Sequence, residues 1–370
     1  MTRYAHIVGW GMSVPSRVLT NYELAQMVNT SEEWILTRTG IRERHIAEPH
    51  QTTASLATDA ARRALALAGL TPLQIDLIIV ATSSPEHIFP ATACLVQDRL
   101  GATHAGAFDL SAACSGFIYA LAVASQMIAT GSNDRALVIG AETLSRIVNW
   151  QDRDTCVLFG DGAGAFVLQG STEEGGLLAH TMHSDGSGAD LLSLPGGGSR
   201  FPTSQETIEK GLHYVSMNGR EVYRFATRVM ASATREVTRK AGIRLRDIDR
   251  IVPHQANLRI IEIAAKSLEL PLERFIVNVD RYGNTSTASI PIAVCEAVEA
   301  GKIQPGNRIV LVGFGAGLTW GSALIEWGVA GRAQPAAWWQ SGFFILRILA
   351  KLRSWLLRVQ RRFESFFWRD

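Results

Sequence analysis

Short apolar runs without interspersed polar positions are the clearest feature of the chain. DLIIVAT, RALVIG and RIVLVG begin at Asp76, Arg135 and Arg308. Strands covered by helices on both faces show such continuous runs, whereas strands with one face in water alternate. Between the runs lie longer segments of helical period, such as FIYALAVASQMIATG over 117–131. The pattern predicts an α/β protein with layered sheets that share buried helices.

An internal repeat divides the chain. AGLTPLQIDLIIV from Ala68 lies over AGIRLRDIDRIVP from Ala241, and RALVIG lies over RIVLVG at the same offset of 173 positions. Each copy continues into a Gly-rich stretch and a final strand. We therefore predict two copies of one α/β unit, at residues 1–175 and 176–328, followed by a linker and tail at 329–370.

Charge and cysteine content narrow the class of protein. The 36 basic and 34 acidic residues give a net charge of +2, so the whole chain has no electrostatic attraction for nucleic acid. The four cysteines lack the spacing of a disulfide or zinc framework. The N-terminus lacks the apolar run of a signal peptide, and no run reaches the roughly 18 apolar residues of a membrane span. We expect a cytoplasmic protein without a structural metal.

Cys114 lies where a strand gives way to a helix. It follows the strand AGAFDL, within SAACSG, and the helical run begins directly afterwards. The N–H groups of a helix N-terminus favour a thiolate and can hold an oxyanion, so Cys114 is a candidate nucleophile, the alternative being a small residue in a tight turn. We expect Cys94, Cys156 and Cys295 to be small buried core residues.

His254 and Asn284 each lie next to a predicted element. His254 follows the strand IDRIV, and Asn284 lies in the turn YGNTSTASIP before an apolar helix. Taken alone, each could be a helix cap or a turn residue. The repeat changes this interpretation, because Cys114 shifted by 173 positions falls on Thr287. A pseudo-twofold arrangement would bring all three side chains to one central site.

The chain resembles the thiolase-fold condensing enzymes, specifically the β-ketoacyl-acyl carrier protein synthase III family, over residues 3–328. The motifs that carry the resemblance are TSEEWILTRTGIRERH, DLSAACSGF, FGDGAGA, VPHQANLRI, YGNTSTASIP and FGAGLTWGSAL. The resemblance implies a thiolase-like α/β fold, with two duplicated halves in layered sheets around buried helices. It also implies a homodimer that condenses an acyl-CoA, with acetyl-CoA as the expected starter, with malonyl-acyl carrier protein, without a metal or a cofactor.

Residue roles follow from the same resemblance. Cys114 matches the acylated nucleophile, and His254 and Asn284 match the pair that supports decarboxylation. The positions that match coenzyme A and substrate contacts are Trp34, Arg38, Arg153, Asn257 and Phe314, although Trp34 alone could be a helix-packing aromatic. Arg259 matches the main contact to the carrier protein. Arg224 and Lys266 extend that basic patch or belong to a solvated helix face.

The tail has no counterpart in the family pattern. Residues 331–370 hold eight basic and two acidic residues, and 343–368 have helical period. We expect Ile345, Leu349, Leu352, Leu356, Val359, Phe363 and Phe366 on one face, and Arg347, Lys351, Ser354, Arg358, Arg361 and Ser365 opposite. Such a helix can bind a membrane surface, dock on an acidic partner or another copy, or pack on the body.

Two further functions stay open from the sequence. A family member can serve specialised metabolism, for example alkylquinolone synthesis or head-to-head acyl condensation. A homologue without activity can act as a scaffold. The simultaneous presence of Cys114, His254 and Asn284 favours an enzyme, because a scaffold does not need all three.

Overall fold

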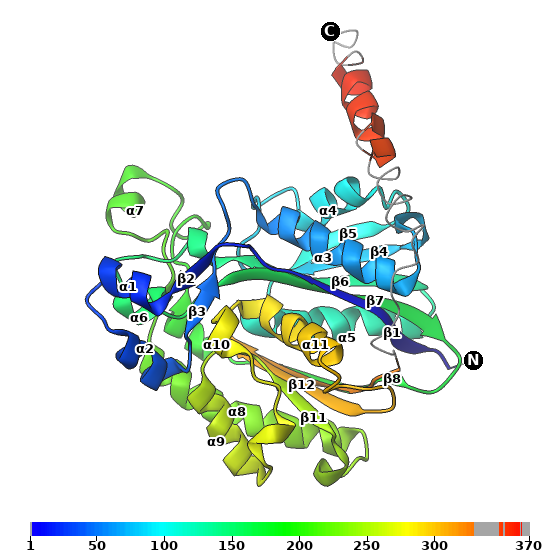
Figure 1. Ribbon diagram of the computed structural model, residues 1–370. Helices are drawn as coiled ribbons and strands as arrows, with labels where there is room; N and C mark the ends of the chain where they lie inside the picture. The colour runs from blue at the N-terminus through cyan, green and yellow to red at the C-terminus, as the bar shows by residue number, and fades with distance from the viewer. Residues whose placement is uncertain (1, 329–347, 351, 363, 365–370) are drawn as a thin grey trace.

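Two large β-sheets and three layers of helices alternate through the body of the molecule (Figure 1). The computed structural model describes residues 2–328, 348–350, 352–362 and 364. The first sheet has the order β1-β7-β6-β4-β5, and the second has the order β11-β12-β13-β8. The strands of the first are β1 (Tyr4–Ser13), β4 (Leu77–Ala81), β5 (Gly106–Leu110), β6 (Arg135–Thr143) and β7 (Asp161–Ser171). Those of the second are β8 (Gly176–Ser184), β11 (Arg250–Pro253), β12 (Arg308–Gly315) and β13 (Thr319–Glu326).

The two sheets share one plan of pairing. In the first, β4 is parallel to β5 and β6, while β7 is antiparallel to β6 and β1. In the second, β11 is parallel to β12, while β13 is antiparallel to β12 and β8. Strands β4 and β6 begin 173 positions before β11 and β12, the offset found in the sequence. A short bridge from Ile251 to Phe275 stands where β5 stands in the first sheet.

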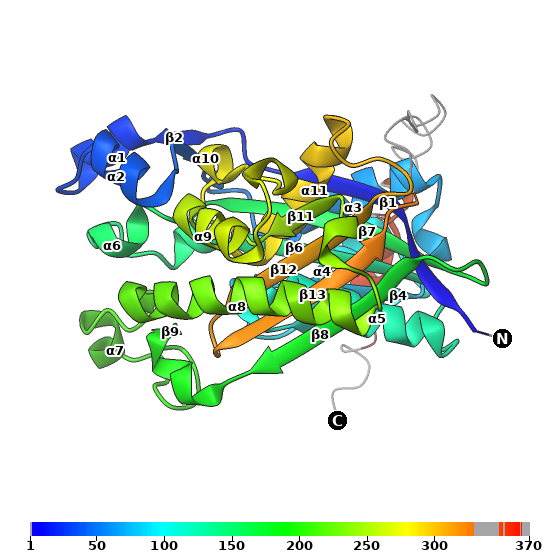
Figure 2. The ribbon, with the colours of Figure 1, turned by 90° about the horizontal axis from the view of Figure 1, so that it is seen from below.

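Two helices fill the layer between the sheets (Figure 1), and in the view from below the second sheet lies in front of this layer (Figure 2). They are α5 (Gly116–Ala129) and α11 (Ser289–Glu299), which again begin 173 positions apart. Phe117 and Ile290 are fully buried in a core cluster that includes residues of both sheets. A helix that is apolar all round has to be covered on all sides, which explains the nearly uniform apolar character of these two segments.

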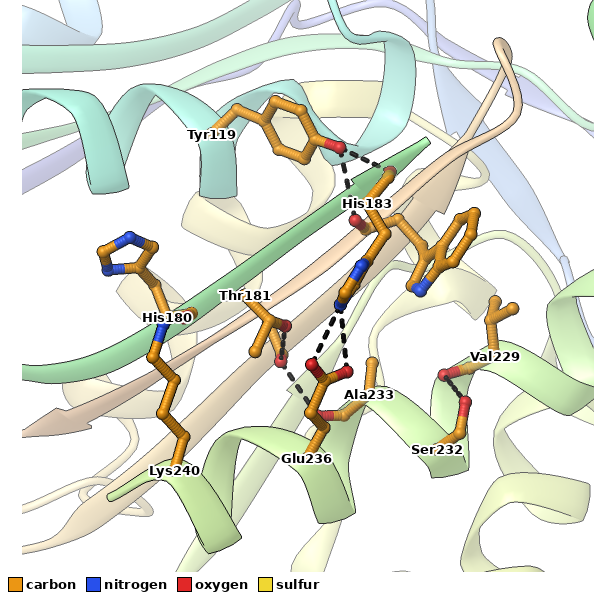
Figure 3. A network of polar contacts seen from close by, with 11 residues as sticks. Tyr119, His180, Thr181, His183, Val229, Ser232, Ala233, Glu236 and Lys240 are labelled. Atoms are coloured by element: carbon orange, nitrogen blue, oxygen red, sulfur yellow. Dashed lines mark hydrogen bonds and ion pairs between the residues drawn. The ribbon is translucent and has the colours of Figure 1, made fainter. Parts of the chain in front are cut away.

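The outer layers are amphipathic helices. Helices α3 (Thr53–Ala68) and α4 (Thr92–Leu100) cover the first sheet, and α8 (Gly219–Lys240) and α9 (Leu258–Leu268) cover the second (Figure 1). Polar contacts hold α8 on β8 (Figure 3). The His183 ring lies 3.0 Å from the Glu236 carboxylate, and Lys240 Nζ donates to the carbonyl of His180 at 2.9 Å. From the central layer, Tyr119 donates its hydroxyl to the carbonyl of His183 at 2.6 Å.

Small elements at one end of the sheets build the entrance to the site. They are β2 (Val18–Thr20), α1 (Asn21–Met27), α2 (Glu32–Thr39), β3 (Glu43–His45), α6 (Arg153–Cys156), β9 (Leu192–Ser193), α7 (Gln205–Glu209), β10 (Ser216–Met217) and α10 (Val279–Tyr282). Arg44 is fully buried among them and donates to the carbonyls of Leu19 and Val157 at 3.1 and 2.7 Å. Burial lowers the pKa of this guanidinium to about 10. The motif TSEEWILTRTGIRERH thus supplies a polar anchor for this end of the molecule.

The described part of the tail is helical and stands on the outer surface beside α4 (Figure 1). Ser354 donates to the Asp98 carboxylate, and Arg358 lies 3.9 Å from it. Leu349, Leu352 and Leu356 are exposed, while Val359 is half-buried. The predictions for Ile345, Arg347, Lys351, Phe363, Ser365 and Phe366 lie outside the described residues. Among the described helices, none is long and apolar enough to cross a membrane.

Candidate active site

One cavity of about 1060 Å³ joins the three residues that the sequence singled out. Cys114, His254 and Asn284 all line it, together with Phe314. Cys114 comes from the turn before α5, His254 from the end of β11, and Asn284 from the turn before α11. Both halves of the chain therefore contribute to a single chamber.

Cys114 is held by an unusual backbone turn. It lies in η2 (Ala113–Ser115), and Ala113 before it has φ +45°, in the left-handed region that non-glycine residues rarely adopt. The second half repeats this turn: η7 (Ser286–Ala288) has Ser286 at φ +48°, again 173 positions further on. Gly315 of β12 lies against the nucleophile turn, since a β-carbon there would come within 2.6 Å of the Cys114 backbone nitrogen.

The acidity of Cys114 differs from our expectation. Burial raises the pKa of the thiol to about 12, the hydrogen bond with Ser286 lowers it, and the negative charge of Glu142 raises it further. This direction is opposite to the lowering that we predicted from the helix N-terminus. The physical reason is the loss of water, because a buried thiolate loses its solvation. The thiol is therefore neutral at pH 7.

His254 is fixed as a neutral donor. Its backbone N–H donates to Val312 at 2.8 Å, and its Nδ1 lies 2.7 Å from the Ser289 hydroxyl. Ser289 Oγ also accepts from the backbone N–H of Gln255 at 3.4 Å, and a hydroxyl can donate to Nδ1 at the same time. With Ser289 as the donor, the ring carries its proton on Nε2. Burial lowers the pKa of His254 to about 3, which keeps the imidazole uncharged.

Asn284 is oriented by the motif FGDGAGA. Its backbone N–H donates to Leu158 at 2.8 Å, and its carbonyl accepts from Gly160 at 3.0 Å. Its side-chain oxygen accepts from the backbone N–H of Ser286 at 2.9 Å, which leaves the NH₂ group as the donor for a ligand. Phe314 packs edge-on against His254, with ring centroids 5.3 Å apart, and closes the apolar side of the chamber.

Glu142 is a buried acidic residue whose charge acts on Cys114, and it was not predicted from the sequence. This carboxylate is fully buried and accepts hydrogen bonds from the backbone N–H groups of Ser83 and Ser84, at 3.1 and 3.0 Å, and from the Ser84 hydroxyl. Burial raises its pKa to about 6. An acidic residue two positions after the buried run RALVIG was the available signal. Ser289 had no such signal, because serine is common before helices.

The mouth of the cavity carries the residues predicted to bind coenzyme A. Trp34, Arg38 and Asn257 line it. Arg153 does not appear among the lining residues, but its guanidinium lies 4.7 Å from the centre of the Trp34 ring. Asn257 donates to the carbonyl of Arg38 at 2.9 Å and caps α9, so it also joins α9 to α2. These residues surround an entrance with an aromatic face and two guanidinium groups.

The predicted basic patch is only partly at this mouth. Arg224 and Arg259 line the cavity, whereas Lys266 is exposed further along α9 and does not line it. Arg224 pairs with Glu221 at 2.7 Å, and the Arg259 guanidinium lies 5.7 Å from the Tyr223 ring centre.

Two of the three remaining cysteines are buried, as we expected. Cys156 and Cys295 are buried, whereas Cys94 is exposed. The expectation for Cys94 was wrong, because this residue lies on a face of α4 that the described chain does not cover.

Comparison with known proteins shows which family the chain matches. Residues 108–186 match the family model 3-Oxoacyl-[acyl-carrier-protein (ACP)] synthase III, and residues 238–327 match the model for its C-terminal part. The chain is 58% identical to a Beta-ketoacyl-[acyl-carrier-protein] synthase III of Symbiobacterium thermophilum over 322 residues, which covers 87% of this chain and 98% of that protein. It is 55% identical to the protein of the same name from Caldanaerobacter subterraneus, over 87% of this chain and 98% of the relative.

Solved structures show the same relationship. The synthase III of Thermus thermophilus superposes with a TM-score of 0.82 at 48% identity, over 88% of this chain and 100% of that one. That of Aquifex aeolicus superposes with a TM-score of 0.81 at 47% identity, over 87% and 100% of the two chains. Fold and site together define a thiolase-fold condensing enzyme. Within that class, the chain belongs to the β-ketoacyl-acyl carrier protein synthase III family.

Proposed function

We propose that this protein catalyses the decarboxylative condensation of an acyl-CoA with malonyl-acyl carrier protein and so starts fatty acid synthesis. Acetyl-CoA is the expected starter. The observation that carries the proposal is the chamber itself, in which one buried thiol and two neutral N–H donors meet. A thiol can hold an acyl group, and neutral donors can stabilise an enolate without protonating it.

The first step transfers the acyl group to Cys114. The sulfur attacks the thioester carbonyl, the new C–S bond forms, the bond to coenzyme A breaks, and the thiol proton ends on coenzyme A. The oxyanion of this step forms beside the start of α5, where backbone N–H groups are available. Because the resting thiol is neutral, its proton leaves only as the thioester reacts, which limits side reactions of a free thiolate.

The second step forms the carbon–carbon bond. Malonyl-acyl carrier protein loses carbon dioxide, and the electron pair of the broken bond becomes an enolate on the thioester. His254 Nε2–H and the Asn284 NH₂ group donate to the enolate oxygen. The carbanion attacks the acyl carbonyl, the C–S bond to Cys114 breaks, and the thiolate that leaves takes a proton from water. A charged imidazolium would risk protonating the carbanion, and the lowered pKa of His254 avoids this.

The residues at the mouth of the cavity can bind coenzyme A in the first step and the acyl carrier protein in the second. Trp34, Arg38 and Arg153 offer an aromatic face and positive charge to the nucleotide end of coenzyme A. Arg259 and Arg224 offer positive charge to an acidic carrier protein. The proposed chemistry draws on thioester substrates and protein groups alone and requires no cofactor.

The proposal includes a cytoplasmic homodimer. Ile88 and Phe89 are 82% and 85% exposed on a loop beside the edge strand β5, where Phe108 is also exposed. Large apolar side chains this exposed favour a protein contact, and β5 offers an unpaired strand edge to a second copy. All four cysteines are free thiols, which agrees with a reducing compartment.

Intact-mass spectrometry after incubation with acetyl-CoA tests whether Cys114 alone is needed for acylation, with His254 and Asn284 needed only for condensation. His254→Ala and Asn284→Ala should each gain one acetyl group at a rate close to that of the unaltered chain, yet lose at least about a hundredfold in condensation. Cys114→Ala should gain no acetyl group, and Cys156→Ala is the matched control that should retain acylation. Loss of acylation in both His254→Ala and Asn284→Ala would contradict the assigned roles.

A further inference from the structure

The tail helix turns its apolar side away from the rest of the molecule. Ala350 and Ser354, four residues apart and thus on one face, are only 8% and 6% exposed. A β-carbon on Gly101 would come within 3.1 Å of Ala350 Cβ, and Ser354 and Arg358 contact Asp98 at the end of α4. This defines the docked face as Ala350, Ser354 and Arg358.

The apolar face lies opposite. At about 100° per residue, Leu352 and Leu356 point about 200° away from Ala350 and Ser354. Five side chains of this face are between 48% and 56% exposed, while Val359 on the same face is half-buried; the five are Ile348, Leu349, Leu352, Trp355 and Leu356. A helix that packs on its own protein usually buries such a stripe. Here the small and polar residues are buried, and the large apolar residues face outward.

Arginines border the apolar face. Arg353 and Arg362 are exposed. Measured around the helix axis from the centre of the apolar face, Arg353 lies about 100° to one side and Arg362 about 80° to the other. Arg358 and Arg361 lie toward the docked side, and the one acidic residue among the described tail positions is Glu364. Long arginine side chains at the border of an apolar stripe reach charged headgroups while their stems stay in apolar surroundings. An exposed Trp355 suits the same boundary.

We propose that the apolar face of the described tail helix, residues 348–350, 352–362 and 364, binds the surface of an anionic lipid bilayer and holds the enzyme there. The positive charge of the helix favours an anionic membrane over a second copy of the helix as the binding partner. Two copies of so basic a helix would repel each other if their apolar faces met, whereas anionic headgroups are attracted to every arginine on its borders. The attachment lies in the interface, because no described helix can cross a membrane. The inference is independent of the condensation chemistry.

Co-sedimentation of the full chain with vesicles tests this inference. The unaltered protein should bind phosphatidylglycerol vesicles and bind phosphatidylcholine vesicles much more weakly, with binding that falls as salt rises. The double variant L352E/L356E should bind phosphatidylglycerol at least about tenfold more weakly, because glutamate keeps the helix but removes the apolar face. R353Q/R362Q should bind about thirtyfold more weakly.

A matched control uses leucines on the body. Leu73 and Leu272 are 48% and 37% exposed, far from the tail in sequence, and L73E/L272E should bind vesicles like the unaltered chain. Condensing activity in lipid-free buffer should be equal in all variants, which shows that the body is folded. If activity is absent throughout, the proposed function fails while the lipid result stands.

Three outcomes would overturn the inference. The first is equal vesicle binding by the unaltered chain and L352E/L356E. The second is absent vesicle binding together with a larger mass in sedimentation velocity that L352E/L356E abolishes, which assigns the face to another copy. The third is absent vesicle binding together with weakened binding of malonyl-acyl carrier protein by L352E/L356E, which assigns it to the acidic partner.

Discussion

His254 and Asn284 each have one polar atom engaged by the protein, and this leaves the other atom for the substrate. Ser289 engages Nδ1 of His254, and the backbone of Ser286 engages the oxygen of Asn284. Both side chains are thereby presented as N–H donors. Neutral donors that are fixed before the reaction stabilise a developing oxyanion without reorganising, which is a large contribution to catalysis in general.

Glu142 gives the stability of the protein a distinctive pH dependence. Burial raises its pKa from 4.5 to about 6 in the folded chain, so the folded state binds this proton more tightly than the unfolded state. Ionisation of Glu142 lowers the free energy of unfolding. This loss is nearly absent below pH 4.5, grows as the pH rises through 6, and then stays at about 2 kcal/mol. In Glu142→Gln this part of the pH dependence should vanish, although the variant is less stable throughout.

Urea denaturation of both proteins at pH 4.5 and pH 7 measures the effect. The unfolding free energy of the unaltered chain should fall between these pH values by about 2 kcal/mol more than that of Glu142→Gln. Parallel changes in the two proteins would show that Glu142 does not titrate in this range.

The limits of prediction at this scale are physical. Cys114, His254 and Asn284 could be identified because each follows a recognisable strand or turn and the repeat aligns them. The pKa of Cys114 could not be predicted, since it depends on how much water the folded chamber excludes. Ser289 was missed for a related reason: its role depends on a 2.7 Å contact with a residue 35 positions away.

At the scale of elements, glycines let strands approach the catalytic turns. Gly315 of β12 lies against the nitrogen of Cys114, and Gly140 of β6 lies against the carbonyl oxygen of Thr287, where a β-carbon would come within 2.5 Å. Neither glycine has a positive φ, so space rather than backbone conformation requires it. Close packing thus explains why glycines occur at the end of β12.

Gly315→Ala should displace the nucleophile turn. The added methyl group would meet the Cys114 backbone at 2.6 Å, which forces a shift, and overpacking of this kind typically costs about 1 to 3 kcal/mol. We expect the rate of Cys114 acetylation, followed by mass spectrometry, to fall at least about tenfold. Gly198→Ala is the control, since a β-carbon there meets nothing within 4 Å. Acetylation of Gly315→Ala at the normal rate would show that the turn tolerates displacement.

The tail shows what periodicity alone can predict about an element. The repeat of leucines indicated a helix with one apolar face, and the described residues agree. Periodicity could not indicate which face meets the body, because that depends on Asp98 and Gly101, some 250 positions earlier. Docking through the polar face became apparent only from the structure.

At the scale of the whole molecule, the exposed loop beside β5 should join two copies. Ile88→Asp combined with Phe89→Asp should weaken self-association at least about a hundredfold, because two large apolar side chains lose their buried contact. Size-exclusion chromatography with light scattering should give twice 40.3 kDa for the unaltered chain and 40.3 kDa for the variant. Leu73→Asp, at an exposed site elsewhere, should stay at the larger mass. A monomeric unaltered chain would refute the dimer.

The glycine contacts link the two halves reciprocally. Gly140 in the first sheet touches the turn of the second half at Thr287, and its counterpart 173 positions later, Gly313, touches the turn of the first half at Cys114. Each half therefore contributes a strand that packs against the turn of the other half, the turn at Cys114 or the turn at Thr287. A fragment that holds Cys114 but lacks the second half would lack the surface that shapes this loop, so we expect such a fragment to be inactive.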